Sequence, residues 1–153
     1  MSAFDVSVIV PAWKAAGFVE RSVASALASR GVAVEVVIVD DASPDNTFEV
    51  LKSLAAADPR VVVDRLAQNS GPSVARNRAI ELSKGRYIAI LDADDAITAG
   101  RLAALVALAD RTGADVVVEP HPAGIGIAAA DVVAALQGVG NAAAPAVGHA
   151  LDQ

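Results

Sequence analysis

"YIAILDADD", residues 87–95, runs an apolar segment directly into three carboxylates, at Asp92, Asp94 and Asp95. A short, nearly uninterrupted apolar run is typical of a strand in a parallel sheet, because both faces of such a sheet are covered. Residues two apart on a strand lie on the same side, so Asp92 and Asp94 are expected to project together. The stretch therefore predicts a buried parallel strand that ends at a group of acids.

Similar apolar segments recur along the chain and alternate with segments of helical periodicity. We predict strands over residues 6–12, 34–41, 60–66, 87–94 and 114–120. Spacings of three and four between apolar residues, together with Gly and Pro at the ends, predict a helix in each of the four intervals. This order is typical of an α/β protein with an open, mostly parallel, Rossmann-like sheet and helices on both faces.

The ends of these helices are predicted from their caps. The first contains Val19, Ser22, Val23, Ala26 and Leu27 on one face and stops at Gly31. Ser43 and Pro44 suit the N-cap and first turn of a second helix, which runs through Leu54. The third opens at Gly71-Pro72 and ends at Gly85. Thr98 is expected to cap the fourth, with Leu102, Leu105, Val106 and Ala109 buried.

Composition narrows the class of protein. The 153 residues are 54% hydrophobic and 20% charged, enough to fold around one core. Cysteine is absent and the net charge is -6, which excludes disulfides and argues against a nucleic-acid partner. The start of the chain has no signal-peptide pattern and no apolar run is long enough to span a bilayer. We therefore expect no transmembrane segment and a cytoplasmic location, with the inner membrane face as an alternative site for the full-length protein.

The chain changes character near Pro120. Residues 120–153 are rich in Ala and Gly and contain no Lys, Arg or aromatic residue. We interpret residues 1–119 as one unit and residues 120–153 as a partly helical tail, with residues 128–137 as its candidate helix. "GIGIAA", residues 124–129, matches part of a dinucleotide-binding motif, but no strand ending in an acid follows at the required distance.

The paired acids suggest a metal. Ligands of open parallel sheets bind beyond the carboxyl ends of the strands. Three predicted strands end in this region, at Pro11-Ala12-Trp13, at Asp40-Asp41 and at Asp92-Ala93-Asp94. Two adjacent carboxylates repel each other and repel phosphate, and a hard cation such as Mg²⁺ or Mn²⁺ removes both repulsions. The alternative is that these acids only solvate a loop and cap the following helix.

Three stretches occur in order: "VSVIVPAWK", "VEVVIVDDASPDNT" and "NSGPSVARNRAIELSKGRYIAILDADD". Together they resemble the family 2 glycosyltransferases, bacterial enzymes of the GT-A fold that transfer sugars from nucleotide diphosphates. The resemblance covers about residues 6–118. It implies a donor, UDP as the expected nucleotide, a saccharide or lipid-linked saccharide acceptor, inversion at the sugar, and a role in polysaccharide or cell-envelope glycan synthesis.

The resemblance also implies roles for single residues. The backbone of Pro11 and Ala12 would pass against the base, with Trp13 beside them. Asp40 would accept the uracil imide N–H, and Arg76 would lie near the base or diphosphate. In the stretch Asp92-Ala93-Asp94, the first acid would bind ribose or the metal through water, and Asp94 would ligate the cation.

Each of these roles has a structural alternative. Asp40 would instead cap the loop to Ser43, Arg76 would form a structural ion pair, and Trp13 would pack in the core. The acidic general base of the family lies in a second segment that is not found here, so the catalytic residue is unknown and Asp131 is the one candidate in the tail. We therefore expect a truncated GT-A domain that holds the donor. The rival functions are a non-catalytic nucleotide-sugar-binding module and a sugar nucleotidyltransferase.

Overall fold

A computed structural model describes residues 2–118 and 132–135 of the chain. Ten elements follow in sequence. The strands are β1 (Val6–Ala12), β2 (Val34–Asp40), β3 (Val61–Arg65), β4 (Tyr87–Ile90), β5 (Val116–Val118) and β6 (Val132–Ala135). The helices are α1 (Val19–Leu27), α2 (Thr47–Ala57), α3 (Pro72–Leu82) and α4 (Arg101–Thr112).

The strands form one sheet in the order β3-β2-β1-β4-β6-β5. The first four of these are parallel, and β6 pairs antiparallel with β4 and with β5. The chain moves outward from β1 through β2 to β3 and then returns to place β4 on the other side of β1. This reversal creates a topological switch point at the carboxyl end of β1, where open α/β sheets bind ligands. The predicted α/β class with a mostly parallel sheet is confirmed.

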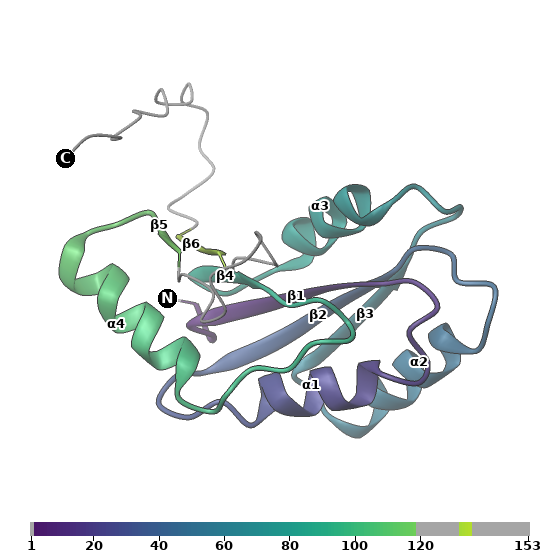
Figure 1. Cartoon of the computed structure of the whole chain (residues 1–153), viewed down its shortest axis with the longest axis horizontal. Coiled ribbons are helices and arrows are strands. Elements are labelled where there is room, and N and C mark those ends of the chain that lie inside the picture. The colour runs from purple at the N-terminus through teal and green to yellow at the C-terminus, as the bar shows by residue number, and fades with distance from the viewer. Residues whose placement is uncertain (1, 119–131, 136–153) are drawn as a thin grey trace, which may run out of the picture.

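The two faces of the sheet have separate cores, because successive strand residues point to opposite sides. Val8 and Val10 pack in the larger core, whereas Ile9 between them packs in the smaller. The larger core holds side chains of α1, α2 and α4, including Leu51 and Leu102. Among the described helices, only α3 contributes to the smaller core, and it covers the opposite face in Figure 1. Helices on both faces were predicted, and the near-continuous apolar strands are explained by these two cores.

Strand β6 corrects the sequence analysis. A helix was predicted over residues 128–137, yet residues 132–135 form a strand between β4 and β5. The rest of the predicted helix lies outside the described residues. Pairing with β4 and β5 provides hydrogen-bond partners for the backbone groups on both sides of β6 and at the edge of β4. These hydrogen bonds outweigh the helix propensity of the alanines. Val132 and Val133, which are β-branched, also suit a strand.

Two helix starts also differ from the prediction. Helix α2 begins at Thr47, not behind a Ser43 cap, because the Ser43 hydroxyl instead accepts the backbone N–H of Lys14 at 2.9 Å. Thr98 was predicted to cap helix α4, but the helix begins three residues later, at Arg101, and its N-cap is Gly100. Its predicted buried face, Leu102, Leu105, Val106 and Ala109, is confirmed. Helix α3 begins at Pro72, as predicted.

Within the described residues, no helix has both the length and the apolar composition that crossing a bilayer requires.

Candidate functional site

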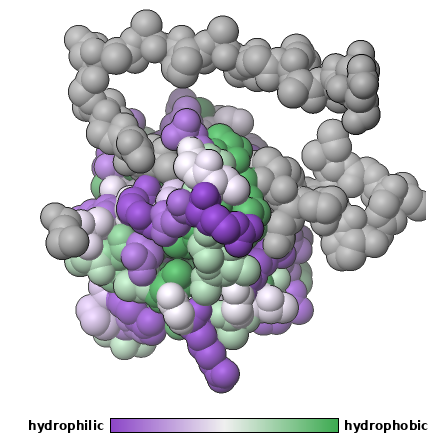
Figure 2. Space-filling view, turned by 90° about the vertical axis from the view of Figure 1, so that its left-hand side faces the viewer, coloured by the Kyte–Doolittle hydropathy of each residue, from purple (hydrophilic) through white to green (hydrophobic). Residues whose placement is uncertain are grey.

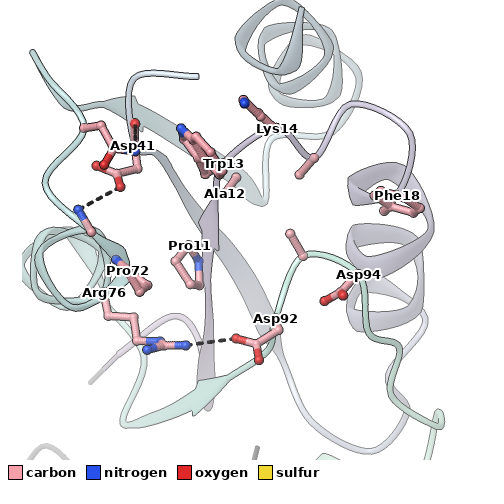
Figure 3. Close-up of a pocket in the computed structure, with 14 residues that line it drawn as sticks. Pro11, Ala12, Trp13, Lys14, Phe18, Asp41, Pro72, Arg76, Asp92 and Asp94 are labelled. Carbon is pink, nitrogen blue, oxygen red and sulfur yellow. Dashed lines mark hydrogen bonds and ion pairs between the residues drawn. The ribbon is translucent and has the colours of Figure 1, made fainter. Parts of the chain in front are cut away.

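A pocket of about 480 Å³ lies at the carboxyl end of β1, between the start of α3 and the loop that follows β4 (Figure 3). This is the switch point of the sheet. The lining residues come from four separated stretches of the chain: Pro11, Ala12, Trp13, Lys14, Ala15, Phe18, Asp41, Asn69, Gly71, Pro72, Arg76, Asp92, Ala93 and Asp94. All of the predicted site residues are among them except Asp40.

Asp40 lies outside the pocket lining and is fully buried. Its carboxylate accepts the backbone N–H of Ser43 at 3.3 Å and forms an ion pair with Nε of Arg65 at 3.1 Å. The structure therefore does not bring Asp40 together with the other predicted residues. It supports the alternative in which this acid fixes the loop after β2.

Asp41, its neighbour, does line the pocket. Its carboxylate accepts the backbone N–H groups of Ser70 at 2.7 Å and Gly71 at 2.9 Å, and one of these bonds is drawn in Figure 3. Asn69 donates its side-chain amide to the Asp41 carbonyl at 3.3 Å. Asp41 thus ties the loop before α3 to the sheet. Gly71 takes a φ of 88°, which favours glycine at this turn.

Arg76 and Asp92, which both line the pocket, form an ion pair. The Nη2 atom of Arg76 lies 3.0 Å from Oδ1 of Asp92, and both side chains are about one-third exposed, at 31% and 35%. The predicted alternative of an ion pair is therefore present, but both partners also line the pocket. Nε of Arg76 has no hydrogen-bond partner within the described part of the chain. The guanidinium is therefore not saturated by protein acceptors.

Two aromatic side chains, those of Trp13 and Phe18, line the pocket. Trp13 is 50% exposed and Phe18 is 54% exposed, which excludes the core-packing alternative for Trp13. The ammonium of Lys14 lies 4.3 Å from the centroid of the Trp13 ring, a cation–π contact. An exposed indole at a pocket wall is suited to stacking on a planar ligand.

Two hydroxyls from the β2–α2 region hold the backbone beside Trp13. Lys14 N–H donates to the Ser43 hydroxyl and Ala15 N–H to the Thr47 hydroxyl, both at 2.9 Å. Lys14 itself takes a φ of 51°, a left-handed conformation that these bonds help to hold. The Thr47 hydroxyl also donates to Asp45, and this hydrogen bond lowers the pKa of the Asp45 carboxyl.

The acids of the β4–α4 loop could hold a divalent cation only with help from a ligand. Asp94 is exposed, and no hydrogen bond to its carboxylate is seen among the described residues, whereas Asp92 is shared with Arg76. No group of three or more potential metal ligands occurs among the described residues. Two carboxylates suit Mg²⁺ or Mn²⁺, which commonly keep several waters and bind phosphate oxygens. The donor set therefore fits a cation that arrives with a diphosphate.

Seven lining residues were given no binding role from the sequence: Lys14, Ala15, Phe18, Asp41, Asn69, Gly71 and Pro72. Of these, only Asp41 was placed at a strand end in the ligand-binding region. Adjacent strand residues point to opposite sides, so the pair Asp40-Asp41 itself signalled that one acid faces the pocket and the other does not. The sequence does not say which. The loop at 69–71 carries a polar and glycine-rich pattern, but its approach to β1 depends on the strand order.

The chain matches the model of the family described as "Glycosyl transferase family 2" over residues 7–126. Among curated proteins, it is 43% identical over 115 residues to the succinoglycan biosynthesis protein ExoO of Rhizobium meliloti, covering 75% of this chain and 32% of that protein. It is 44% identical over 90 residues to the putative teichuronic acid biosynthesis glycosyltransferase TuaG of Bacillus subtilis, covering 59% of this chain and 36% of that protein.

Solved structures agree in fold. The chain superposes on S. aureus TarS 1–349 in complex with UDP with a TM-score of 0.65 and 31% identity, covering 73% of this chain and 34% of that one. A mannosyltransferase from Pyrobaculum calidifontis, in complex with GDP-Man and Mn²⁺, gives a TM-score of 0.56 at 28% identity, covering 61% and 28%. The chain spans about one-third of the length of these relatives. The family match, the relatives and the GT-A sheet together show that the chain belongs to glycosyltransferase family 2.

Proposed function

We propose that the pocket binds a nucleotide-diphosphate sugar, with UDP as the nucleotide, and that residues 1–119 are the donor-binding half of an inverting glycosyltransferase. The observation that carries this proposal is the pocket at the switch point, with Asp41 at one side and the Asp92-Ala93-Asp94 loop at the other. Support comes from TarS, whose solved structures include complexes with UDP and UDP-GlcNAc. Relatives named for succinoglycan and teichuronic acid biosynthesis support a role in polysaccharide or cell-envelope glycan synthesis.

We assign the uracil base of the nucleotide to the Asp41 side of the pocket. A carboxylate offers about four lone-pair positions, and two backbone N–H groups use only part of that capacity. The Asp41 carboxylate can therefore accept the imide N–H of uracil while it holds the loop. Trp13 would stack on the base, with the backbone of Pro11 and Ala12 beside it. This proposal gives Asp41 the role that sequence analysis gave to Asp40.

The diphosphate is assigned to the side formed by Arg76, Asp92, Ala93 and Asp94. Arg76 would bind phosphate oxygens through donors that Asp92 leaves free. Asp94, helped by Asp92, would ligate Mg²⁺ or Mn²⁺ together with the diphosphate. A cation in this position offsets the negative charge that builds on the departing diphosphate. The acids therefore bind the leaving group and do not act on the acceptor.

The general base remains unassigned. Asp41, Asp92 and Asp94 all have binding roles in the proposal, and Asp131 lies outside the described residues. This favours a second candidate function for the chain by itself, in which it binds the donor but transfers no sugar. The acceptor, a saccharide or lipid-linked saccharide, would then meet its base in the remaining length that the relatives possess. Incubation of the chain with UDP-sugars and oligosaccharide acceptors tests this candidate, and robust transfer would contradict it.

Calorimetry with UDP, in the presence of Mn²⁺ or of EDTA, tests the main proposal. We expect binding in both conditions and higher affinity with Mn²⁺. Asp94→Ala should abolish the gain from Mn²⁺, while Asp95→Ala, a change one residue away outside the pocket lining, should preserve it. The absence of measurable UDP binding would overturn the proposed site. Equal affinity for UDP in Mn²⁺ and in EDTA would overturn the metal assignment.

The Asp41→Asn substitution tests whether Asp41 binds the uracil base. An amide of the same shape presents an N–H₂ group, which opposes one of the two loop N–H groups for either nucleotide. It also opposes the uracil imide N–H, whereas it complements N3 of cytosine. Loss of one charge-assisted hydrogen bond weakens UDP binding by about 1.5–3 kcal/mol, or roughly ten- to a hundredfold. We expect this loss for UDP and a smaller one for CDP. Equal losses for the two nucleotides would contradict the assignment.

A further inference from the structure

Helix α1 contacts the acidic loop after β4 through side chains that reach the loop's backbone. Arg21 donates from Nη2 to the carbonyl of Asp94 at 2.6 Å. The Ser22 hydroxyl donates to the carbonyl of Asp92 at 3.2 Å. Both bonds join residues about seventy positions apart in the sequence. They act on the backbone of the two acids and leave the acids' carboxylates free for other partners.

A third contact continues the series. The backbone N–H of Ile97 donates to the Ser25 hydroxyl at 3.1 Å, and that hydroxyl donates in turn to the Ser22 carbonyl at 2.7 Å. Ser22 is fully buried and Ser25 is half-buried, so these bonds are shielded from water. Positions 21, 22 and 25 lie on one side of the helix, because residues three and four apart are neighbours on its surface.

The loop has no regular structure of its own, so its conformation depends on contacts from elsewhere in the chain. Strand β4 ends at Ile90, and the residues from Asp92 to the start of α4 have no regular structure. The backbone hydrogen bonds within this stretch are short-range turns, such as Asp95 N–H to the Asp92 carbonyl at 3.0 Å, and a longer-range bond joins its far end, where the Ala99 carbonyl accepts the N–H of Arg30 at 2.7 Å. A metal site requires its ligands to be held within a fraction of an ångström of the bound geometry. The α1 contacts supply this constraint.

We propose that Arg21, Ser22 and Ser25 form a clamp that positions Asp92 and Asp94 for the cation and diphosphate. They are positioning residues, since they act on the backbone and not on the ligand. The inference rests on the proposed function, because it presumes that these acids bind the cation. Arg21 also brings a positive charge close to the loop, which favours an anionic ligand there.

The clamp predicts a selective effect on metal-dependent binding. Titrations with UDP, in Mn²⁺ and in EDTA, are made for Arg21→Gln, Ser22→Ala, Ser25→Ala and the triple variant. Each hydrogen bond contributes modestly, so the triple variant should lose about tenfold or more of the Mn²⁺-dependent affinity. The affinity in EDTA should change less than about twofold, because Asp41 and Trp13 are untouched. Arg21→Lys should recover part of the loss seen in Arg21→Gln.

Controls separate this clamp from general stability. Ser53→Ala and Arg111→Gln make the same chemical changes at exposed helix positions and should not alter binding. Circular dichroism checks the fold of each variant. If the triple variant does not fold, the single variant Arg21→Gln, which changes an exposed residue, is used for the titration instead. If the variants bind like the original chain, or lose affinity equally in Mn²⁺ and EDTA, the clamp is overturned while the nucleotide site stands. If the original chain shows no Mn²⁺ effect, the metal assignment and the clamp fail together.

Discussion

Buried acids occur at both ends of the parallel strands, and their surroundings differ. At the amino end, Glu35 is 1% exposed and one oxygen accepts the Ser7 hydroxyl and the Lys84 N–H, both at 2.6 Å. The Ser7 hydroxyl also accepts the N–H of Gly85 at 2.7 Å. At the carboxyl end, Asp41 is 3% exposed yet borders the pocket.

A buried carboxylate stabilises the fold where protein donors surround it and can bind a ligand where it borders a pocket. The amino-end network is closed by protein donors and lies away from the pocket. Figure 2 looks onto this end of the molecule and shows hydrophilic residues in a band across it. At the carboxyl end, loops between strands and helices diverge around the switch point, so Asp41, Asp92 and Asp94 border the pocket, although Asp40 stays buried outside it. We therefore expect changes in the amino-end network to alter stability and changes of the pocket acids to alter binding.

Gly85→Ala should have the largest effect on stability. A Cβ at this position would lie 2.4 Å from the backbone N of Ser7, which sits inside central strand β1 and cannot move aside. We expect a loss of about 3 kcal/mol or more in the free energy of unfolding, measured by urea denaturation. Gly100→Ala, where the added Cβ meets nothing within 4 Å, is the control and should be nearly neutral. Similar stability of the two variants would break the comparison.

Glu35→Ala should come next. It leaves the Ser7 hydroxyl and the Lys84 N–H without their acceptor inside the protein, at a cost of about 2–3 kcal/mol of unfolding free energy. Glu35→Gln retains an acceptor oxygen and should lose less. UDP affinity of the folded variants should equal that of the original chain. A variant that keeps its stability but binds UDP poorly would show that this end also serves the ligand.

A smaller effect concerns acid stability near the amino end. The hydrogen bonds from Arg86 and then Tyr87 lower the pKa of Asp110. A carboxyl whose pKa is lower in the folded state adds stability above its unfolded pKa of about 3.9, and this contribution is lost as pH falls through the folded pKa. Asp110→Asn should therefore flatten the fall in melting temperature below about pH 4. Asp115→Asn is the exposed control, and an equal flattening there would contradict this cause.

Ala42→Gly should give the smallest change, and it should be a gain. Ala42 takes a φ of 55°, which costs a residue with a Cβ but not glycine. Relief of this strain, reduced by the greater freedom of glycine in the unfolded chain, should add about 0.5–1 kcal/mol. Ala28→Gly, at a φ of -78°, should add nothing. Equal effects at the two positions would show that Ala42 is not strained.

Much of the fold could be predicted from the sequence because its cause is local. The apolar runs at residues 6–12 and 34–41 identify two central strands, and the alternation of strands and helices predicts the class. Strand β6 could not be predicted in this way, since its state depends on pairing with β4 and β5 rather than on its own alanines. The Ser43 cap failed for a similar reason, because a distant backbone N–H takes its hydroxyl.

The site was predictable in its location and less so in its residues. Motifs at the strand ends led to Trp13, Arg76 and the Asp92-Ala93-Asp94 stretch, and all of these residues line the pocket. The choice between Asp40 and Asp41 depends on how the strand turns at its end, which the sequence does not encode locally. The contacts of α1 with the acidic loop depend on tertiary packing between residues far apart in sequence.

We expect nucleotide to bind at the carboxyl end of the sheet and nowhere on the amino end. A titration of the ¹⁵N-labelled chain with UDP and Mg²⁺, followed through backbone amide chemical shifts, locates the binding site residue by residue. We predict saturable shifts at Trp13, Asp41, Gly71 and Asp94, with Ser7, Glu35 and Gly85 unchanged. Shifts centred on the amino-end residues, or no shifts at millimolar UDP, would contradict the account.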